Sequence, residues 1–245
     1  MKLLKLCFII SLTFSFTQAQ VEIFEEANAL YQNAEYEQAI KKYEQMLKSD
    51  LFSENLHYNL GNAFYHTDQV GLSILHLEKA LKLNPGSKRI EHNLRLSYLK
   101  TKEKIEPLPR LFFVSWWYSL LSKNNASQWG KRAIFAAFIS LALLVFFKFY
   151  KNSLLQYLAI FMIITSISLA FLANRKYQYD YKHRFAILMM NEAELKETPN
   201  ETAKPLATIY EGFKLEIIDQ VDDWSQVKLD DGSEAWVLTK ALTEI

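Results

Sequence analysis

Residues 154–173 form a run of twenty without a charged side chain, and few folds can accommodate such a segment. As a helix this run would be about 30 Å long, which matches the hydrocarbon thickness of a bilayer. A second apolar run covers residues 133–147, and Trp129 and Tyr150 flank it as aromatic residues suited to a membrane interface. Because only a short loop joins the runs, we predict transmembrane helices over 129–150 and 154–173 that form an antiparallel hairpin.

The N-terminus predicts export. Residues 1–19 combine a basic start, an apolar stretch and small residues at Thr17 and Ala19, as in a secretory signal peptide cleaved after Ala19. An uncleaved anchor helix is the alternative. Export would place the soluble parts in the periplasm and the hairpin in the inner membrane as a multi-pass anchor. The positive-inside rule favours the opposite topology, because the hairpin's outer flanks carry more basic residues than its loop; we follow the signal peptide.

A short aromatic segment precedes the hairpin. Residues 111–121 read LFFVSWWYSLL, which is too short to span a bilayer but rich in side chains that prefer its surface. Within the linker region 104–128 we therefore predict an interfacial helix, and a buried protein contact is the alternative. The predicted membrane-interface residues are Trp116, Trp117, Tyr118 and Trp129.

Residues 20–103 contain an internal repeat. An offset of 34 residues places Ala27 on Gly61, Tyr31 on Tyr65 and other apolar positions on one another, in a pattern with helical spacing. The segments ALYQNAEYEQAIKKYEQMLKSDL and YNLGNAFYHTDQVGLSILHLEKALKLNP resemble the tetratricopeptide repeat. The resemblance implies an α-solenoid with repeats near 20–53 and 54–87 and a cap helix over 88–103.

The same resemblance implies a concave groove lined by the first helix of each repeat. Tyrosines and amides there would suit an extended peptide, because they offer flat apolar contact and hydrogen bonds to its backbone. Simple solvation of that face, or contact with the cap helix, is the alternative for each side chain. The candidate partner-binding residues are Asn28, Tyr31, Tyr58, Asn59, Asn62, Tyr65, His66, Arg89, His92 and Asn93.

The C-terminal segment 185–245 has short alternating runs that predict five strands of a small β-barrel, near 185–190, 206–210, 213–219, 224–229 and 234–238. Gly212, Gly232 and the patterns Trp224-x-x-Val and Trp236-Val resemble the bacterial SH3-like domain of exported proteins, although Ala235 stands where a glycine is usual. Trp224 and Trp236 would line a peptide or glycan groove, or else close the barrel core.

Composition excludes several function classes. Residues 104–184 carry 11 basic and 2 acidic side chains (+9), whereas 185–245 carry 5 and 13 (−8), and no segment has the dense basic face of a nucleic-acid-binding protein. The single cysteine, Cys7, lies in the predicted signal peptide. No metal-ligand spacing, nucleophile motif or phosphate-binding loop occurs. We therefore predict no enzyme activity, no catalytic residues, no metal, no cofactor and no small-molecule substrate.

The order of parts resembles the BatE family of aerotolerance (Bat) operon proteins of Bacteroidetes. Its fold class would be a multi-domain α + β membrane protein with an α-solenoid, a two-helix transmembrane hairpin and a small SH3-like β-barrel. The resemblance implies a non-enzymatic inner-membrane scaffold that assembles with von Willebrand A-domain membrane proteins and supports tolerance to oxidative stress. The alternative function is a cell-envelope sensor or tether that binds peptidoglycan peptide through the SH3-like domain.

Overall fold

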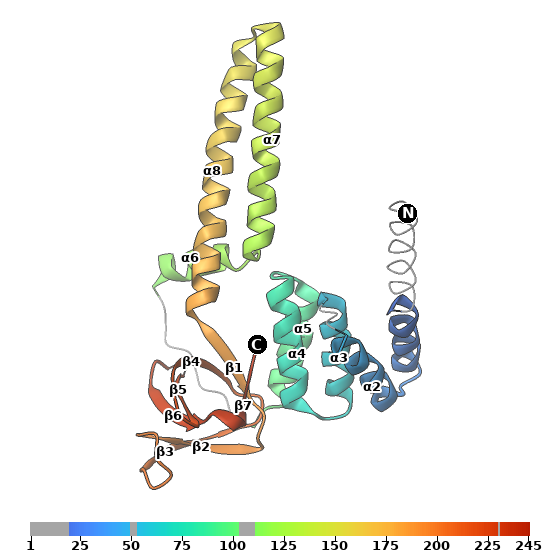
Figure 1. Ribbon diagram of the computed structural model, residues 1–245, viewed down its shortest axis with the longest axis vertical. Coiled ribbons are helices and arrows are strands. Elements are labelled where there is room, and N and C mark those ends of the chain that lie inside the picture. Colours follow the sequence, from blue (N-terminus) through green and yellow to red (C-terminus); the bar gives the residue numbers. More distant parts are fainter. Residues whose placement is uncertain (1–19, 50–52, 103–110, 230) are drawn as a thin grey trace, which may run out of the picture.

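The computed structural model describes residues 20–49, 53–102, 111–229 and 231–245 (Figure 1). The predicted signal peptide, 1–19, lies outside the described residues, as do residues 103–110 at the end of the predicted cap helix and the start of the linker region. The described chain has three parts: an N-terminal group of helices, a long helical hairpin that extends away from it, and a C-terminal β-sheet.

The N-terminal part consists of antiparallel helices that pack in chain order. A helix over 20–32 is followed by α2 (Tyr36–Leu47), α3 (Glu54–His66), α4 (Val70–Leu83) and α5 (Lys88–Leu99), so the last helix stops before the predicted end of the cap. Ala34 and Asp68, which the 34-residue offset superposes, both adopt positive φ, at 61° and 59°. Equivalent turns thus separate the helices of each pair.

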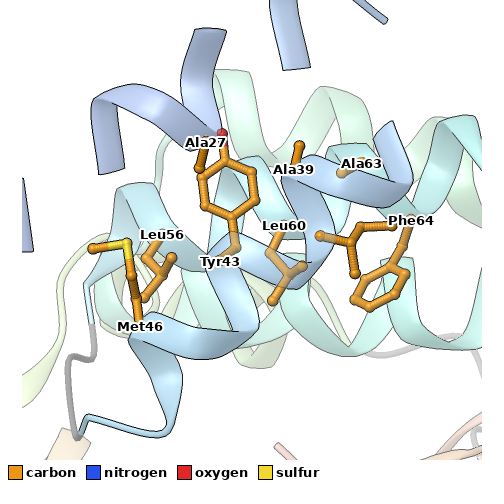
Figure 2. Close-up of a cluster of buried hydrophobic side chains, with 9 residues drawn as sticks. Ala27, Ala39, Tyr43, Met46, Leu56, Leu60, Ala63 and Phe64 are labelled. Atoms are coloured by element: carbon orange, nitrogen blue, oxygen red, sulfur yellow. The ribbon is translucent and has the colours of Figure 1, made fainter. Parts of the chain in front are cut away.

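Small residues at the helix crossings let these helices approach closely. Ala27, Ala39 and Ala63 are fully buried in one apolar cluster with Tyr43 (Figure 2). Between α3 and α4 the space is tighter still, since a Cβ on Gly61 would lie 2.8 Å from Leu77 Cγ. The alanine and glycine positions of the sequence repeat are therefore packing positions.

The hairpin consists of α7 (Ala126–Tyr150) and α8 (Ser153–Lys182), and both are long and apolar enough to cross a membrane. Small residues form their contact, where Ser166 Oγ donates a hydrogen bond of 2.9 Å to the carbonyl of Ala133. Large apolar side chains such as Phe135, Phe138 and Phe161 point outward and are 68%, 66% and 63% exposed. Such a surface suits lipid far better than water.

Helix α6 (Phe112–Leu121) lies across the base of the hairpin (Figure 1). Trp116 is 58% exposed, whereas Trp117 and Tyr118 are half-buried, and the Tyr118 ring lies 5.5 Å from that of Tyr179 in α8. Trp129 differs from the others, because it is buried and its Nε1 donates to the carbonyl of Leu121 at 3.4 Å. Trp129 thus fixes α6 to α7 rather than presenting its ring to lipid.

Within the described residues the C-terminal part is a seven-stranded antiparallel sheet with the order β3-β2-β6-β5-β4-β1-β7. It exceeds the five predicted strands by β2 and β7, which the sequence analysis missed. The strands are β1 (Arg184–Leu188), β2 (Glu192–Lys196), β3 (Pro205–Tyr210), β4 (Lys214–Val221), β5 (Trp224–Lys228), β6 (Glu234–Leu238) and, after the short helix η1 (Thr239–Ala241), β7 (Leu242–Glu244).

The sheet also packs against the helices. Ile187 of β1 is fully buried in a cluster with Ile74 and Leu77 of α4 and Ile90 of α5. Polar contacts surround this cluster: the Gly71 amide donates to Glu211 Oε1 at 2.8 Å, and Lys214 Nζ lies 2.7 Å from Glu78 Oε2. The helical part and the sheet each have an apolar cluster of their own and share this third one at their contact.

Candidate functional site

The predicted groove amides bind one another in the helical part. Asn59 Nδ2 donates to Asn28 Oδ1 at 2.8 Å, and Asn93 Nδ2 donates to Asn62 Oδ1, also at 2.8 Å. The Tyr43 hydroxyl adds a third bond of 2.7 Å to Asn28 Oδ1, and burial raises the pKa of this phenol to about 12, so it stays a neutral donor. These amides link neighbouring helices and, in this arrangement, contribute more to the stack than to an outer surface.

Three of the predicted groove residues, Tyr31, Tyr65 and His66, lie together in the helical part, whereas Tyr58 contacts Arg89 instead. The His66 ring stacks on Tyr36 with centroids 4.4 Å apart, and Tyr31 and Tyr65 approach that histidine at 5.9 and 5.7 Å. We call Tyr31, Tyr36, Tyr65 and His66 the aromatic patch. Tyr36 was missed by sequence reasoning, because it starts the second helix of its pair, and only the turn after residue 32 brings it to this surface.

Basic side chains border this face. Lys100 Nζ lies 4.0 Å from the centre of the Tyr65 ring and bonds Asp68 Oδ1 at 2.5 Å, and the Arg89 guanidinium lies 4.1 Å from the centre of the Tyr58 ring. His92 is exposed on α5. A cation over an aromatic ring is attracted to it, so Lys100 stabilises the position of the Tyr65 ring within the patch.

The sheet carries a cavity of about 320 Å³ beside Trp224. Glu192 and Glu194 of β2 and Glu201 of the β2–β3 loop supply carboxylates to its wall, and Lys196 supplies the one lysine. The lysine already lies 2.6 Å from Glu194 Oε2. The lining comprises Met190, Glu192, Ala193, Glu194, Lys196, Glu201, Trp224, Val237, Leu238 and Ala241. This acidic groove would favour a ligand that carries an amine next to an apolar group.

The two tryptophans lie on the same face of the sheet, but only one of them lines the acidic groove. Trp224 pairs with Leu238 and Trp236 with Gln226, so both side chains leave the β5–β6 pair on one face, opposite the buried Val227 and its neighbours. Both are half-buried, and Trp224 lines the acidic groove, whereas Trp236 lies outside its lining.

A buried histidine pair escaped the sequence analysis. His57 and His76 lie 19 residues apart in sequence, yet their Nδ1 atoms are 3.0 Å apart between α3 and α4, so one ring donates a hydrogen bond to the other. Burial lowers the pKa of His57 to about 4 and that of His76 to about 3, and Lys79 adds to both effects. Both rings are therefore neutral near pH 7.

The described ranges contain no group of three His, Cys, Asp or Glu side chains that could hold a metal ion. In the turn before β6, Asp231 accepts hydrogen bonds from the hydroxyl and the backbone N–H of Ser233, which lower the pKa of its carboxyl group. This carboxylate stabilises its own turn.

Comparison with known proteins gives one family match, and it falls on the sheet. Residues 191–243 match the family model of the bacterial SH3 domain. The match begins after β1 and includes β2 to β6, so the predicted SH3-like fold is confirmed for this segment. Strand β1, which lies between the hairpin and the matched residues, pairs with β4 of the same sheet.

The structures of NlpC2 and NlpC1 from Trichomonas vaginalis are also similar to part of the chain. Each is 16% identical over 26% of this chain, with TM-scores of 0.24 and 0.23. The chain spans about a quarter of either structure, 25% and 24%. No curated protein matches the sequence.

Proposed function

We propose that this chain is a non-enzymatic, membrane-anchored scaffold that holds two protein-binding surfaces at the periplasmic face of the inner membrane. One observation carries the proposal: α8 leads into β1 through His183 alone, and β1 packs on α4. In the described residues, the hairpin thereby continues into the bacterial SH3 domain, whose sheet packs on the helical part. Such a unit can present two surfaces in a fixed relation to the bilayer.

Topology is the first test. A compartment-specific reporter fused after Ile245 is expected to be active only outside the cytoplasm, and a reporter within residues 148–153 only inside it. The two fusions should be made in the full chain and compared at equal expression. The reverse pattern would contradict the proposed orientation, because the basic flanks would then have determined insertion.

The aromatic patch is the proposed contact of the helical part. It would bind an extended segment of a partner as a tetratricopeptide groove does, and the resemblance to the Bat system points to a von Willebrand A-domain membrane protein within an aerotolerance complex. The patch combines flat aromatic rings with Lys100 over Tyr65, and aromatic side chains dominate many protein interfaces.

Loss of the patch should weaken capture of such a partner. With a von Willebrand A-domain membrane protein co-expressed beside the full chain, the double change Tyr65→Ala and His66→Ala is expected to reduce co-purification about tenfold, the effect of one well-buried contact. Arg95→Ala, an exposed change on α5 outside the candidate partner-binding residues, is the control. Equal recovery with both variants would remove the patch from the interface.

A second candidate function rests on the acidic groove. Its carboxylates and Trp224 suit a peptide with a free amine, such as a peptidoglycan stem peptide, and the chain would then act as an envelope sensor or tether. The full chain in detergent is expected to co-sediment with purified sacculi, and Trp224→Ala to reduce this about fivefold, within the range found for one aromatic contact. Trp236→Ala should retain binding, and the absence of any co-sedimentation would dismiss this function.

A further inference from the structure

A second cavity, of about 380 Å³, lies where the three parts of the chain meet. The ends of α4 and α8, the strands β1, β4 and β7, and the turn after α6 all contribute to it. We call it the junction cavity. Its lining includes four carboxylates and four lysine or arginine side chains, namely Glu78, Glu91, Asp180, Glu244, Lys82, Lys176, Arg184 and Lys214.

Opposite charges alternate around this cavity. Lys176 Nζ lies 2.8 Å from Asp180 Oδ1, Lys214 lies 2.7 Å from Glu78, and Arg184 pairs with Glu244. A ligand of one charge sign would be attracted by half of these groups and repelled by the other half. A ligand that carries both a cation and an anion matches the wall, because each of its charges can join an existing pair.

The cavity begins close to the membrane surface of the hairpin. Lys176 follows the end of the charge-free run by three residues, which is about 4.5 Å along a helix, and the polar head groups occupy roughly 5–8 Å beyond the hydrocarbon layer. Helix α6 lies across the hairpin at this level, and Ser122, which follows it, lines the cavity (Figure 1). The side nearest the membrane is therefore at head-group depth.

The order of the charges along α8 is informative. Asp180 lies one turn beyond Lys176, about 6 Å farther from the membrane, and both side chains line the cavity. In a phospholipid with an amino head group, the phosphate joins the glycerol and the ammonium lies beyond it. Along the helix axis, Lys176 and Asp180 thus follow the order of the charges that would meet them, and their charged atoms, 2.8 Å apart, form the ion pair that the head group would join.

We propose that the junction cavity binds the head group of an aminophospholipid, with its phosphate at Lys176 and its ammonium at Asp180. The inference rests on the membrane anchoring in the proposed function. A primary ammonium donates hydrogen bonds to carboxylates, whereas a choline head group has no N–H and a glycerol head group has no cation. The site therefore selects phosphatidylethanolamine over phosphatidylcholine and phosphatidylglycerol. The bound lipid connects all three parts of the chain.

The test uses the full chain in nanodiscs that contain equal amounts of these three lipids. Native mass spectrometry should find phosphatidylethanolamine retained about tenfold more than either of the others, the equivalent of one charge-assisted hydrogen bond. Lys176→Gln and Asp180→Asn should each abolish this preference. Lys182→Gln, an exposed change on the same helix outside the cavity lining, should preserve it.

A charge-reversed variant separates ligand binding from helix stability. The double change Lys176→Asp and Asp180→Lys keeps an ion pair on α8 but reverses its order, so the preference should be lost while the helix remains intact by circular dichroism. Equal retention of phosphatidylglycerol by the unchanged chain would overturn the proposal, as would an unaltered preference in this variant.

Two further measurements distinguish a lipid from a free metabolite as the ligand, and a failure of membrane anchoring from a failure of lipid selectivity. Soluble glycerophosphoethanolamine should compete only weakly if the acyl chains hold the head group at the cavity; full displacement at low concentration would assign the site to a free metabolite and overturn the lipid assignment. Failure of the chain to enter nanodiscs would refute membrane anchoring. Entry without lipid preference would refute only this inference.

Discussion

Replacement of Gly61 by valine is expected to lower the free energy of unfolding of the helical part by about 3 kcal/mol. A Cβ at this position would lie 2.8 Å from Leu77 Cγ and 3.1 Å from the Leu77 backbone nitrogen. The backbone cannot yield without separating α3 from α4, and valine adds two methyl groups to the overlap. The higher helix propensity of valine offsets only a small part of this cost.

Hydrogen exchange of the α3 and α4 amides is the suitable measurement, because it reports the opening of these helices separately from the hairpin and the sheet. Their exchange should accelerate strongly, whereas amides in β4 and β5 should change less. Gly130→Val is the matched control, since apart from the neighbouring backbone of its own helix nothing lies within 4 Å of the Cβ position there. Similar exchange rates in the two variants would show that α3 and α4 do not cross as closely as described.

The second large effect is an acid destabilisation of the helical part. His57 and His76 are 4% and 9% exposed, and burial holds their pKa values at about 4 and about 3, below the value of about 6.5 in an unfolded chain. The unfolded state therefore binds more protons below pH 6.5. The contribution of the neutral histidine pair to the free energy of unfolding is fully present above pH 6.5. It is lost as the pH falls toward the pKa values of the folded state.

Between pH 7 and pH 5 this loss should amount to about 3 kcal/mol, with a discount for the partial solvent access of His57. Denaturant unfolding monitored by α3 and α4 exchange at several pH values measures it. The double change His57→Gln and His76→Gln should flatten the profile over this range, whereas His92→Gln, at an exposed position, should leave its slope as it is. A slope that the double change does not alter would assign the acid sensitivity to other groups.

Local patterns in the sequence predicted the helices and five of the seven strands, but they missed β2 and β7. The charge-free run, the aromatic segment before it and the alternating strands each predict their element, because hydrophobic period and length are local properties. Strand β2 (Glu192–Lys196) was missed because its sequence, EAELK, carries charges at alternate positions and only Leu195 is buried. Strand β7 was missed because its three residues follow a turn of 3-10 helix too closely to form a separate run.

The candidate sites depended on contacts between distant residues, which a single sequence does not show. The asparagines looked like groove residues, yet Asn28 and Asn62 accept bonds from amides 31 positions later and stabilise the stack. The His57–His76 pair and the burial of Ile187 among α4 and α5 likewise require the helices and the sheet to be assembled first. Composition indicated only that residues 185–245 carry a net negative charge. The groove beside Trp224 shows where some of those carboxylates lie together.

The single-residue connection between α8 and β1 makes the hairpin a lever. A helix of thirty residues is about 45 Å long, so a change of ten degrees in its tilt displaces one end by about 8 Å relative to the other. Helices adjust their tilt to the thickness of the surrounding bilayer. Because β1 continues that helix and packs on α4, a thinner or thicker membrane would reorient both binding surfaces together, and lipid composition would set the angle at which partners meet them.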